Sequence, residues 1–354
     1  MQELAAVTGI PRVTISRVIN QHPHVSERMR RRVQEAIARY GYESNIMARS
    51  LVMRRNNLLA FIVPDIRISF YSEMIDRVER EALGQGLDLL PFNSFFNAER
   101  ERHLLTLVRR LQADTLIIVP ITAHGELVNG AELAGFRKRV LFFDRFVSPQ
   151  GGSVMMDNAA AGRLAAEHLI ALGHRRLAML ESSEDRRNVC VRDRREGFAR
   201  AVRRHGLPFN RAQRLRLDWP EQSSGFEYGH ALVKTCRPQL RSLGITALFA
   251  HSDHIALGAM RALAEDGIRV PGELSLVGCD DLDFSAYSNP PLTTIRQPVE
   301  EMARALVRAV NTREGDTRVE IAPQLVERDS CAAPRANALR GIASKKITKQ
   351  TPSE

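Results

Sequence analysis

The strongest constraint on the fold is a repeated alternation of short apolar runs with longer amphipathic stretches between Asn57 and Asp329. The apolar runs fall at 58–63, 116–119, 140–143, 177–180, 247–250 and 274–277. Stretches between them, such as 159–172 and 255–265, have the apolar spacing of helices. Short apolar strands that alternate with helices are typical of parallel sheets covered on both faces. The pattern predicts two such sheets in succession, and therefore two α/β lobes.

Composition excludes several classes of protein. The chain has 354 residues, of which 44% are hydrophobic and 26% charged, as in a soluble globular protein with more than one domain. No apolar run approaches the ~18 residues of a membrane span, and the N-terminus lacks the pattern of a secretory signal. The four cysteines form no C-x-x-C pair. We therefore expect a cytoplasmic protein with reduced thiols, and neither a metal nor a cofactor.

The net charge of +10 is concentrated at the two ends of the chain. Residues 1–55 hold ten basic and four acidic side chains, and residues 331–354 hold five basic and one acidic side chain. The residues between these ends hold 36 basic and 36 acidic side chains, which cancel. A neutral body with basic ends favours a polyanionic partner at the ends. A basic surface kept for solubility would give the same balance.

The basic N-terminal segment has the pattern of three short helices. Gly9-Ile10-Pro11 separates the first from the second, in which Ile15, Val18 and Ile19 form an inward stripe. Ser26 is placed to cap a third helix and Gly41 to end it. Two short helices around a tight turn can form a helix-turn-helix, whose second helix lies in the DNA major groove. An ordinary helical subdomain would show a similar apolar pattern.

Several motifs in this order resemble the lactose/galactose repressor (LacI/GalR) family of bacterial transcription regulators. The matching segments are 14–20, 24–26, 36, 40–42, 45–51, 169–174, 256–260 and 291–298. The resemblance covers the chain to about Ser330. Two departures stand out: Met1 falls inside the first helix of the family pattern, and Pro11 replaces the Ser or Thr that caps the second helix.

The resemblance implies roles in DNA binding for individual residues. Arg12, Val13 and Arg17 would contact base edges in the major groove. A second set would hold phosphates: Thr14, Ser16, Asn20, His24, Ser26 and Asn45. Ala48 and Leu51 belong to the family's hinge, where Leu51 would enter the minor groove as a wedge, although a core leucine is the alternative. A hinge helix this short is marginal alone, so we expect it to order when two copies pack together on DNA.

Polar residues gather where the predicted strands end, which is where α/β sheets bind ligands. They are Asp144, Ser252-Asp253 and Asp280-Asp281. The resemblance implies an effector site of Phe70, Tyr71, Asp144, Arg194, Trp219, Ser252 or Asp253, and Asp280. Three of them have another reading: Trp219 as a lobe-packing aromatic, Asp280 as a turn residue, and Arg194 as part of the charged surface run 186–195.

The expected architecture is an all-α helix-turn-helix headpiece followed by a two-lobed, periplasmic-binding-protein-like α/β domain. We expect the headpiece at 1–44, a hinge at 45–56, the two-lobed domain at 57–330 and a basic disordered tail at 331–354. Within the domain, the first lobe would hold about 57–156 and 291–319, and the second about 157–290 and 320–330.

The expected function is sequence-specific transcriptional regulation, most simply repression. A homodimer would bind a pseudo-palindromic double-stranded DNA operator, and a small-molecule effector, a sugar or sugar derivative, would control it allosterically. The alternatives are a two-lobed sugar-binding protein without a DNA role, and an α/β enzyme acting on a sugar. Against the enzyme, the sequence has no G-x-S-x-G elbow, P-loop or G-x-G-x-x-G fingerprint.

Overall fold

The computed structural model describes residues 2–19, 22–41, 56–121, 140–145, 151–181, 189–218, 224–311 and 318–335. The chain divides into two compact units, 1–57 and 58–354. Asn20, Asn45, Ala48, Leu51 and Trp219 lie outside the described residues, as does nearly all of the expected hinge.

The first unit contains the three predicted helices, α1 (Gln2–Thr8), α2 (Arg12–Ile19) and α3 (Glu27–Tyr40). Gly9 lies between α1 and α2 with a φ of 64°, a conformation that glycine adopts without strain. The apolar core of this unit consists of Leu4, Ile10, Ile15, Val18 and Val33. Gly41 ends α3 in the left-handed conformation, and its N–H donates to the Ile37 carbonyl. Ser26 occupies the N-cap position of α3, but its hydroxyl makes no capping hydrogen bond.

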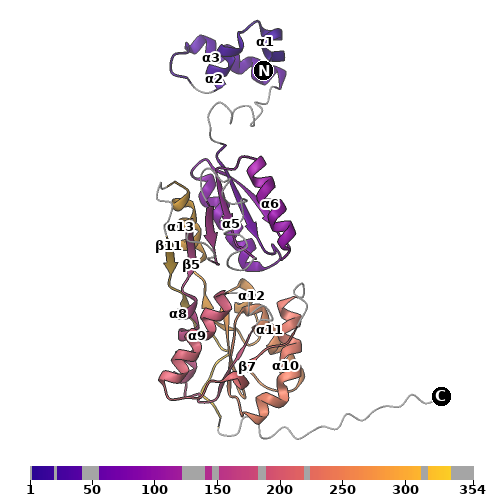
Figure 1. The fold of residues 1–354 in the computed structure, drawn as a ribbon, viewed down its shortest axis with the longest axis vertical. Coiled ribbons are helices and arrows are strands. Elements are labelled where there is room, and N and C mark those ends of the chain that lie inside the picture. Colours follow the sequence, from indigo (N-terminus) through magenta and orange to yellow (C-terminus); the bar gives the residue numbers. More distant parts are fainter. Residues whose placement is uncertain are drawn as a thin grey trace, which may run out of the picture. The chain divides into compact units, whose positions relative to one another are not determined.

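The first lobe of the second unit is built on six parallel strands. They are β1 (Leu58–Val63), β2 (Asp88–Asn93), β3 (Thr115–Ile118), β4 (Val140–Phe143), β5 (Gly152–Met156) and β11 (Arg318–Ile321), in the order β11-β5-β4-β3-β1-β2. The helices of this lobe are α5 (Ser69–Leu83), α6 (Ala98–Arg110) and α13 (Val299–Asn311). Figure 1 shows α13 beside β5 and β11. α13 contacts both of these strands and also α5.

Alternate residues of β1 face different helices, which explains why its sequence is continuously apolar. Phe61 packs in one cluster with Met74 of α5 and Met302 of α13. Its neighbour Ile62 packs in another cluster with Leu104 of α6. A strand that is buried on both faces has no position left for a polar side chain.

The second lobe has a six-stranded sheet in which only one edge strand is antiparallel. Its strands are β6 (Leu177–Leu180), β7 (Arg214–Leu215), β8 (Ala247–Ala250), β9 (Ser275–Asp280), β10 (Thr293–Arg296) and β12 (Gln324–Val326), in the order β12-β10-β9-β8-β6-β7. β12 runs antiparallel to β10. The helices are α8 (Asn158–Ala171), α9 (Val189–Arg204), η1 (Arg211–Gln213), α10 (Gly225–Ser242), α11 (Asp253–Glu265) and α12 (Asp283–Ala286).

The division of the chain between the lobes differs from the expected one. β10 belongs to the second sheet, although 291–319 was assigned to the first lobe, and β11 keeps residues 320 and 321 in the first sheet. The chain therefore passes between the lobes after β5, after β10 and after β11. The apolar runs of the sequence included neither β10 nor β11, and the sheet that each strand joins depends on its pairing with strands far away in the chain.

The start of the expected disordered tail is attached to the second lobe, which corrects that prediction for Cys331 and Ala332. The Ala332 carbonyl lies 2.9 Å from Nε2 of His174, and the Ala332 N–H donates to Oγ of Ser275 at 3.1 Å. The Cys331 thiol donates to the Leu276 carbonyl at 3.3 Å. Residues 336–354 lie outside the described part of the chain.

Two pairs of helices in the second lobe approach so closely that only glycine fits between them. A Cβ added to Gly197 of α9 would collide with the carbonyl of Ala159 on α8, and one added to Gly162 of α8 would collide with the carbonyl of Arg194 on α9. Gly229 of α10 and Gly258 of α11 are related in the same reciprocal way. The close contact between α8 and α9 places the Arg194 backbone directly against Gly162 of α8.

Candidate DNA-binding surface and effector site

The exposed face of α2 carries the side chains that were predicted to contact base edges. Arg12, Val13 and Arg17 are exposed, whereas Ile15 and Val18 of the same helix are buried. Val13 is 62% exposed, so it does not belong to the core of the first unit. Thr14 and Ser16 are half-buried, and His24 and Ser26 are exposed beyond the end of α2. Apart from the residues outside the described part, the predicted DNA-binding side chains are thus at the surface.

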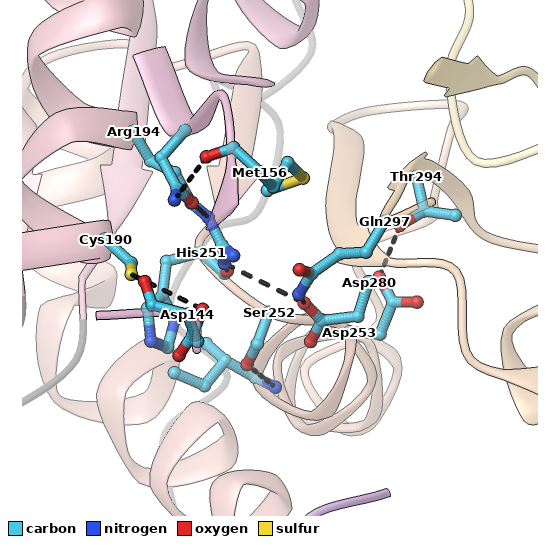
Figure 2. Close-up of polar contacts among 12 residues, drawn as sticks. Asp144, Met156, Cys190, Arg194, His251, Ser252, Asp253, Asp280, Thr294 and Gln297 are labelled. Carbon is cyan, nitrogen blue, oxygen red and sulfur yellow. Dashed lines mark hydrogen bonds and ion pairs between the residues drawn. The ribbon is translucent and has the colours of Figure 1, made fainter. Parts of the chain in front are cut away.

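Asp144 is a point of contact between the two lobes at the candidate effector site. It follows β4 with a φ of 60°, and the Tyr71 hydroxyl donates to its carboxylate at 3.0 Å. The thiol of Cys190, on α9 of the second lobe, donates to the Asp144 carbonyl at 2.9 Å. Figure 2 shows Cys190 pointing toward Asp144. Phe70 is buried and stacks on Phe143, the last residue of β4, with ring centroids 5.8 Å apart. Phe70 therefore packs against the end of the strand that carries Asp144.

Arg194 is a buried member of the site, so its reading as part of a solvated surface run is wrong. It is 5% exposed. Its Nε donates to Oδ1 of Asn158 at 2.7 Å, and its Nη1 donates to the His251 carbonyl at 2.6 Å. The same Nη1 lies 3.8 Å from Oδ1 of Asp280, which is an ion pair rather than a hydrogen bond. A buried guanidinium with one long ion pair keeps donor capacity for a ligand.

Asp280 ends β9 in a strained backbone conformation, with a φ of 128°. Burial raises the pKa of its carboxyl group to about 7, although the Arg194 guanidinium lowers it. Nε2 of Gln297 donates to Oδ1 of Asp280 at 2.7 Å, as Figure 2 shows. Oε1 of Gln297 is buried and has no hydrogen-bond partner within the described structure. Because an unsatisfied buried acceptor is costly, this atom indicates a missing donor at the site.

Ser252 and Asp253 have contacts that serve the framework of the second lobe. Ser252 caps α11 by accepting from the Ile255 N–H at 3.4 Å. Asp253 is fully buried, and its carboxylate accepts from three donors: the Leu282 N–H at 2.9 Å, the Ser285 hydroxyl at 2.7 Å and the Thr294 hydroxyl at 2.6 Å. The effector role expected for Ser252 or Asp253 stays a prediction, and these bonds give Asp253 a structural role as well.

Four residues of this site were not predicted from the sequence: Asn158, Cys190, His251 and Gln297. Gln297 directly follows β10 and Asn158 comes two residues after β5, so both lie near strand ends, as Asp144 and Asp280 do, and the strand-end rule could have found them. His251 contributes its backbone carbonyl, for which the identity of the side chain gives no signal. Cys190 lies in a helix and meets Asp144 only because the two lobes are in contact.

Replacing Asp280 with asparagine is expected to change how stability depends on pH. Burial favours the protonated carboxyl, so its contribution to stability is complete below about pH 4 and is lost as the pH rises through about 7. Asparagine is neutral throughout and keeps an acceptor for Gln297. The variant should melt close to wild type at pH 5 and several degrees higher at pH 8, measured by differential scanning fluorimetry. A difference that is constant across this range would contradict the role of burial.

Comparisons with known proteins agree with this arrangement. A family model for "Bacterial regulatory proteins, lacI family" matches residues 1–45, and one for a "Periplasmic binding protein-like domain" matches residues 166–331. The transcriptional regulator GalR of Escherichia coli (strain K12) is 30% identical over 347 residues, which cover 96% of this chain and 97% of the relative. The transcriptional repressor PurR of Aliivibrio fischeri (strain MJ11) is 28% identical over 337 residues, which cover 93% of this chain and 97% of the relative.

A solved structure shows the same fold over nearly the whole chain. It is the Lac repressor dimer bound to operator and the anti-inducer ONPF, and it matches with a TM-score of 0.78 and 26% identity over 93% of this chain and 98% of that chain.

Proposed function

We propose that this chain, which belongs to the lacI family of bacterial regulatory proteins, represses transcription under the control of a small hydroxylated effector. The first unit would bind one half of a pseudo-palindromic operator, and a second copy of the chain would bind the other half. The effector would bind in the second unit beside Asp144, Arg194 and Asp280. The hinge at 45–56 would couple the two events, with a coupling free energy of typically ~1–3 kcal/mol.

The unpaired Oε1 of Gln297 is the observation that carries the effector proposal. This buried acceptor lies beside a carboxyl group that accepts hydrogen bonds and close to the guanidinium of Arg194. A ligand with several hydroxyl groups supplies donors to Gln297 and Asp280 and an acceptor to Arg194. We therefore propose a sugar or sugar derivative, and Trp219 would add a stacking surface.

The effector proposal is tested by thermal-shift screening of the full chain against sugars, sugar acids and nucleobases. A specific ligand should raise the melting temperature of the wild type by mass action. Arg194→Met should abolish this shift, because it removes the buried donor and keeps much of the side-chain volume. Arg102→Met, on the exposed face of α6, is the control and should respond like wild type. A ligand that stabilises both variants equally would place the binding site elsewhere.

Replacing Arg17 with alanine is expected to weaken binding to a selected operator by roughly 5- to 150-fold, the value of one bidentate contact to a base. Operators would first be selected from random duplexes, and affinities would be measured by fluorescence anisotropy. Binding of the variant to random duplex should fall much less, because non-specific binding depends on phosphates. Arg102→Ala should match wild type on both duplexes. A protein that selects no sequence at all would overturn the DNA-binding proposal.

Regulation is favoured over the alternative of a sugar enzyme by the similarity of this chain, over nearly its whole length, to transcriptional regulators. Burial raises the pKa of the thiols of Cys190 and Cys279, so neither is poised as a nucleophile. A regulator of chromosomal operators acts in the cytoplasm. Among the described residues, no helix is long and apolar enough to cross a membrane.

A further inference from the structure

His251 directly follows β8 and joins the candidate effector site through its backbone, whereas its ring has no assigned role. The His251 carbonyl accepts from Nη1 of Arg194 at 2.6 Å (Figure 2), and the His251 N–H donates to the Leu180 carbonyl at 3.1 Å. The residue is partly exposed. Nδ1 of its ring is nevertheless buried and makes no hydrogen bond to any described residue. A buried polar atom without a partner is costly, so this nitrogen indicates a partner that binds from outside the chain.

The imidazole of His251 is neutral at physiological pH. Burial, together with the neighbouring Arg194 and His254, lowers the pKa of this ring to about 3. A neutral imidazole has one N–H donor and one acceptor nitrogen, so it pairs with a hydroxyl group in either direction. A cationic group at the same place would lie close to the Arg194 guanidinium, and like charges repel each other. Hydroxyl groups are therefore better partners for this ring than ammonium groups.

Gln297, which also has a buried atom without a partner, occupies the equivalent place at the end of β10. Phe249 of β8 and Ile295 of β10 pack in one cluster with residues of α8 and α9. His251 and Gln297 each come two residues further along the chain, so strand alternation predicts that they lie on this same face. β9 separates β8 from β10. The backbones of the two residues are thus about 10–12 Å apart, from two strand spacings and the strand register.

We propose that the ring of His251 binds one hydroxyl group of the effector while Gln297 binds another, so that the two residues select a monosaccharide without a cationic group. Arg194 lies between them, since its Nη1 reaches the His251 carbonyl and the Asp280 carboxylate that accepts from Gln297. Nδ1 reaches the ligand by a half turn of the ring about χ2, a torsion with two broad minima. The rigid ring of a monosaccharide carries hydroxyl groups on opposite edges, so little freedom is lost on binding.

The inference rests on the proposed effector binding, and replacing His251 with leucine tests it first without any ligand. Leucine has a similar volume and removes the unpaired nitrogen. Ligand-free His251→Leu should therefore melt roughly 2–4 °C above wild type in differential scanning fluorimetry. His205→Leu, at an exposed histidine after α9, is the control and should melt like wild type. A His251→Leu variant that melts below wild type would show that the ring supports the fold, which would overturn the proposal.

Effector affinity should change in the opposite direction. The probes are D-glucose, D-galactose, D-xylose, D-glucuronate and D-glucosamine, titrated into the full chain by calorimetry. The sugar that wild type binds most tightly should bind His251→Leu roughly tenfold more weakly, because one of its hydroxyl groups then faces an apolar side chain. His251→Asn keeps a polar atom at the place of Nδ1 and should stay within about threefold of wild type. His205→Leu should bind like wild type.

Equal affinity of wild type and His251→Leu for this sugar would overturn the proposal, as would a wild type that prefers glucosamine to glucose. A wild type that binds a nucleobase and none of these sugars would overturn the ligand class and leave effector control intact. Failure of the proposed function looks different. Wild type would then bind no compound in the wider screen of sugars, sugar acids and nucleobases, whatever the melting temperature of the ligand-free variants.

Discussion

Replacing Gly197 with alanine is expected to destabilise the second unit by about 3 kcal/mol, at the upper end of the usual cost of overpacking. The added methyl group would collide with the carbonyl of Ala159, which is backbone and cannot rotate away. The helices α8 and α9 would have to separate, and Arg194 would move with α9. Alanine favours a helix over glycine by about 1 kcal/mol, which offsets only part of this cost.

Gly84→Ala is the matched control for this variant. Gly84 ends α5 with a φ of −60°, and a Cβ there would lie 3.5 Å from the Glu81 carbonyl, an ordinary contact. Urea unfolding of the control should give wild-type stability or a gain of about 0.4–1 kcal/mol, because alanine restricts the unfolded chain. A Gly197→Ala variant as stable as Gly84→Ala would show that α8 and α9 leave room for a Cβ at this position.

Replacing Asp253 with alanine is expected to cost roughly 3–5 kcal/mol, because three buried donors lose their acceptor at once. These donors come from Leu282, Ser285 and Thr294, so the carboxylate joins the start of α11 to α12 and β10. The loss would be measured by urea unfolding, and Asp253→Ala should lose effector binding together with its fold.

Asp253→Asn separates the structural role of this residue from the effector role predicted from sequence. The asparagine oxygen still accepts one or two hydrogen bonds, and its amide can donate to the hydroxyl of Ser285 or Thr294. We expect a loss of stability smaller than that of the alanine variant. If Asp253→Asn is as stable as wild type yet fails to bind an effector that wild type binds, Asp253 is a ligand contact. If it binds normally, the role of Asp253 is structural.

The sequence predicted the helices of the first unit and the strand–helix alternation because both follow from the periodicity of apolar residues. Ile15 and Val18 had to face inward, and Phe61 and Ile62 had to be buried on opposite faces of one sheet. The site was partly predictable for a similar reason: Asp144 directly follows an apolar strand and Asp280 is the last residue of another. Arg194 was identified only through the family resemblance. It is buried, whereas the charged run around it is typical of an exposed surface.

Other features depend on pairings between residues far apart in the chain. Whether β10 joins the first or the second sheet depends on its neighbours, not on its own composition. Likewise, the unpaired oxygen of Gln297 is evident only in the folded structure, in which the amide nitrogen of the same side chain donates to Asp280. The attachment of Ala332 to His174 lies in a segment whose composition resembles that of a disordered tail.

The three passages of the chain between the lobes limit how this protein can be divided. No single cut in the gene separates one lobe from the other, because each lobe is assembled from distant segments that include β11 and β12 near the end of the chain. A truncation before β11 would remove an edge strand from both sheets. One lobe cannot be exchanged as a single continuous segment, whereas the first unit is one continuous segment and can be exchanged as such.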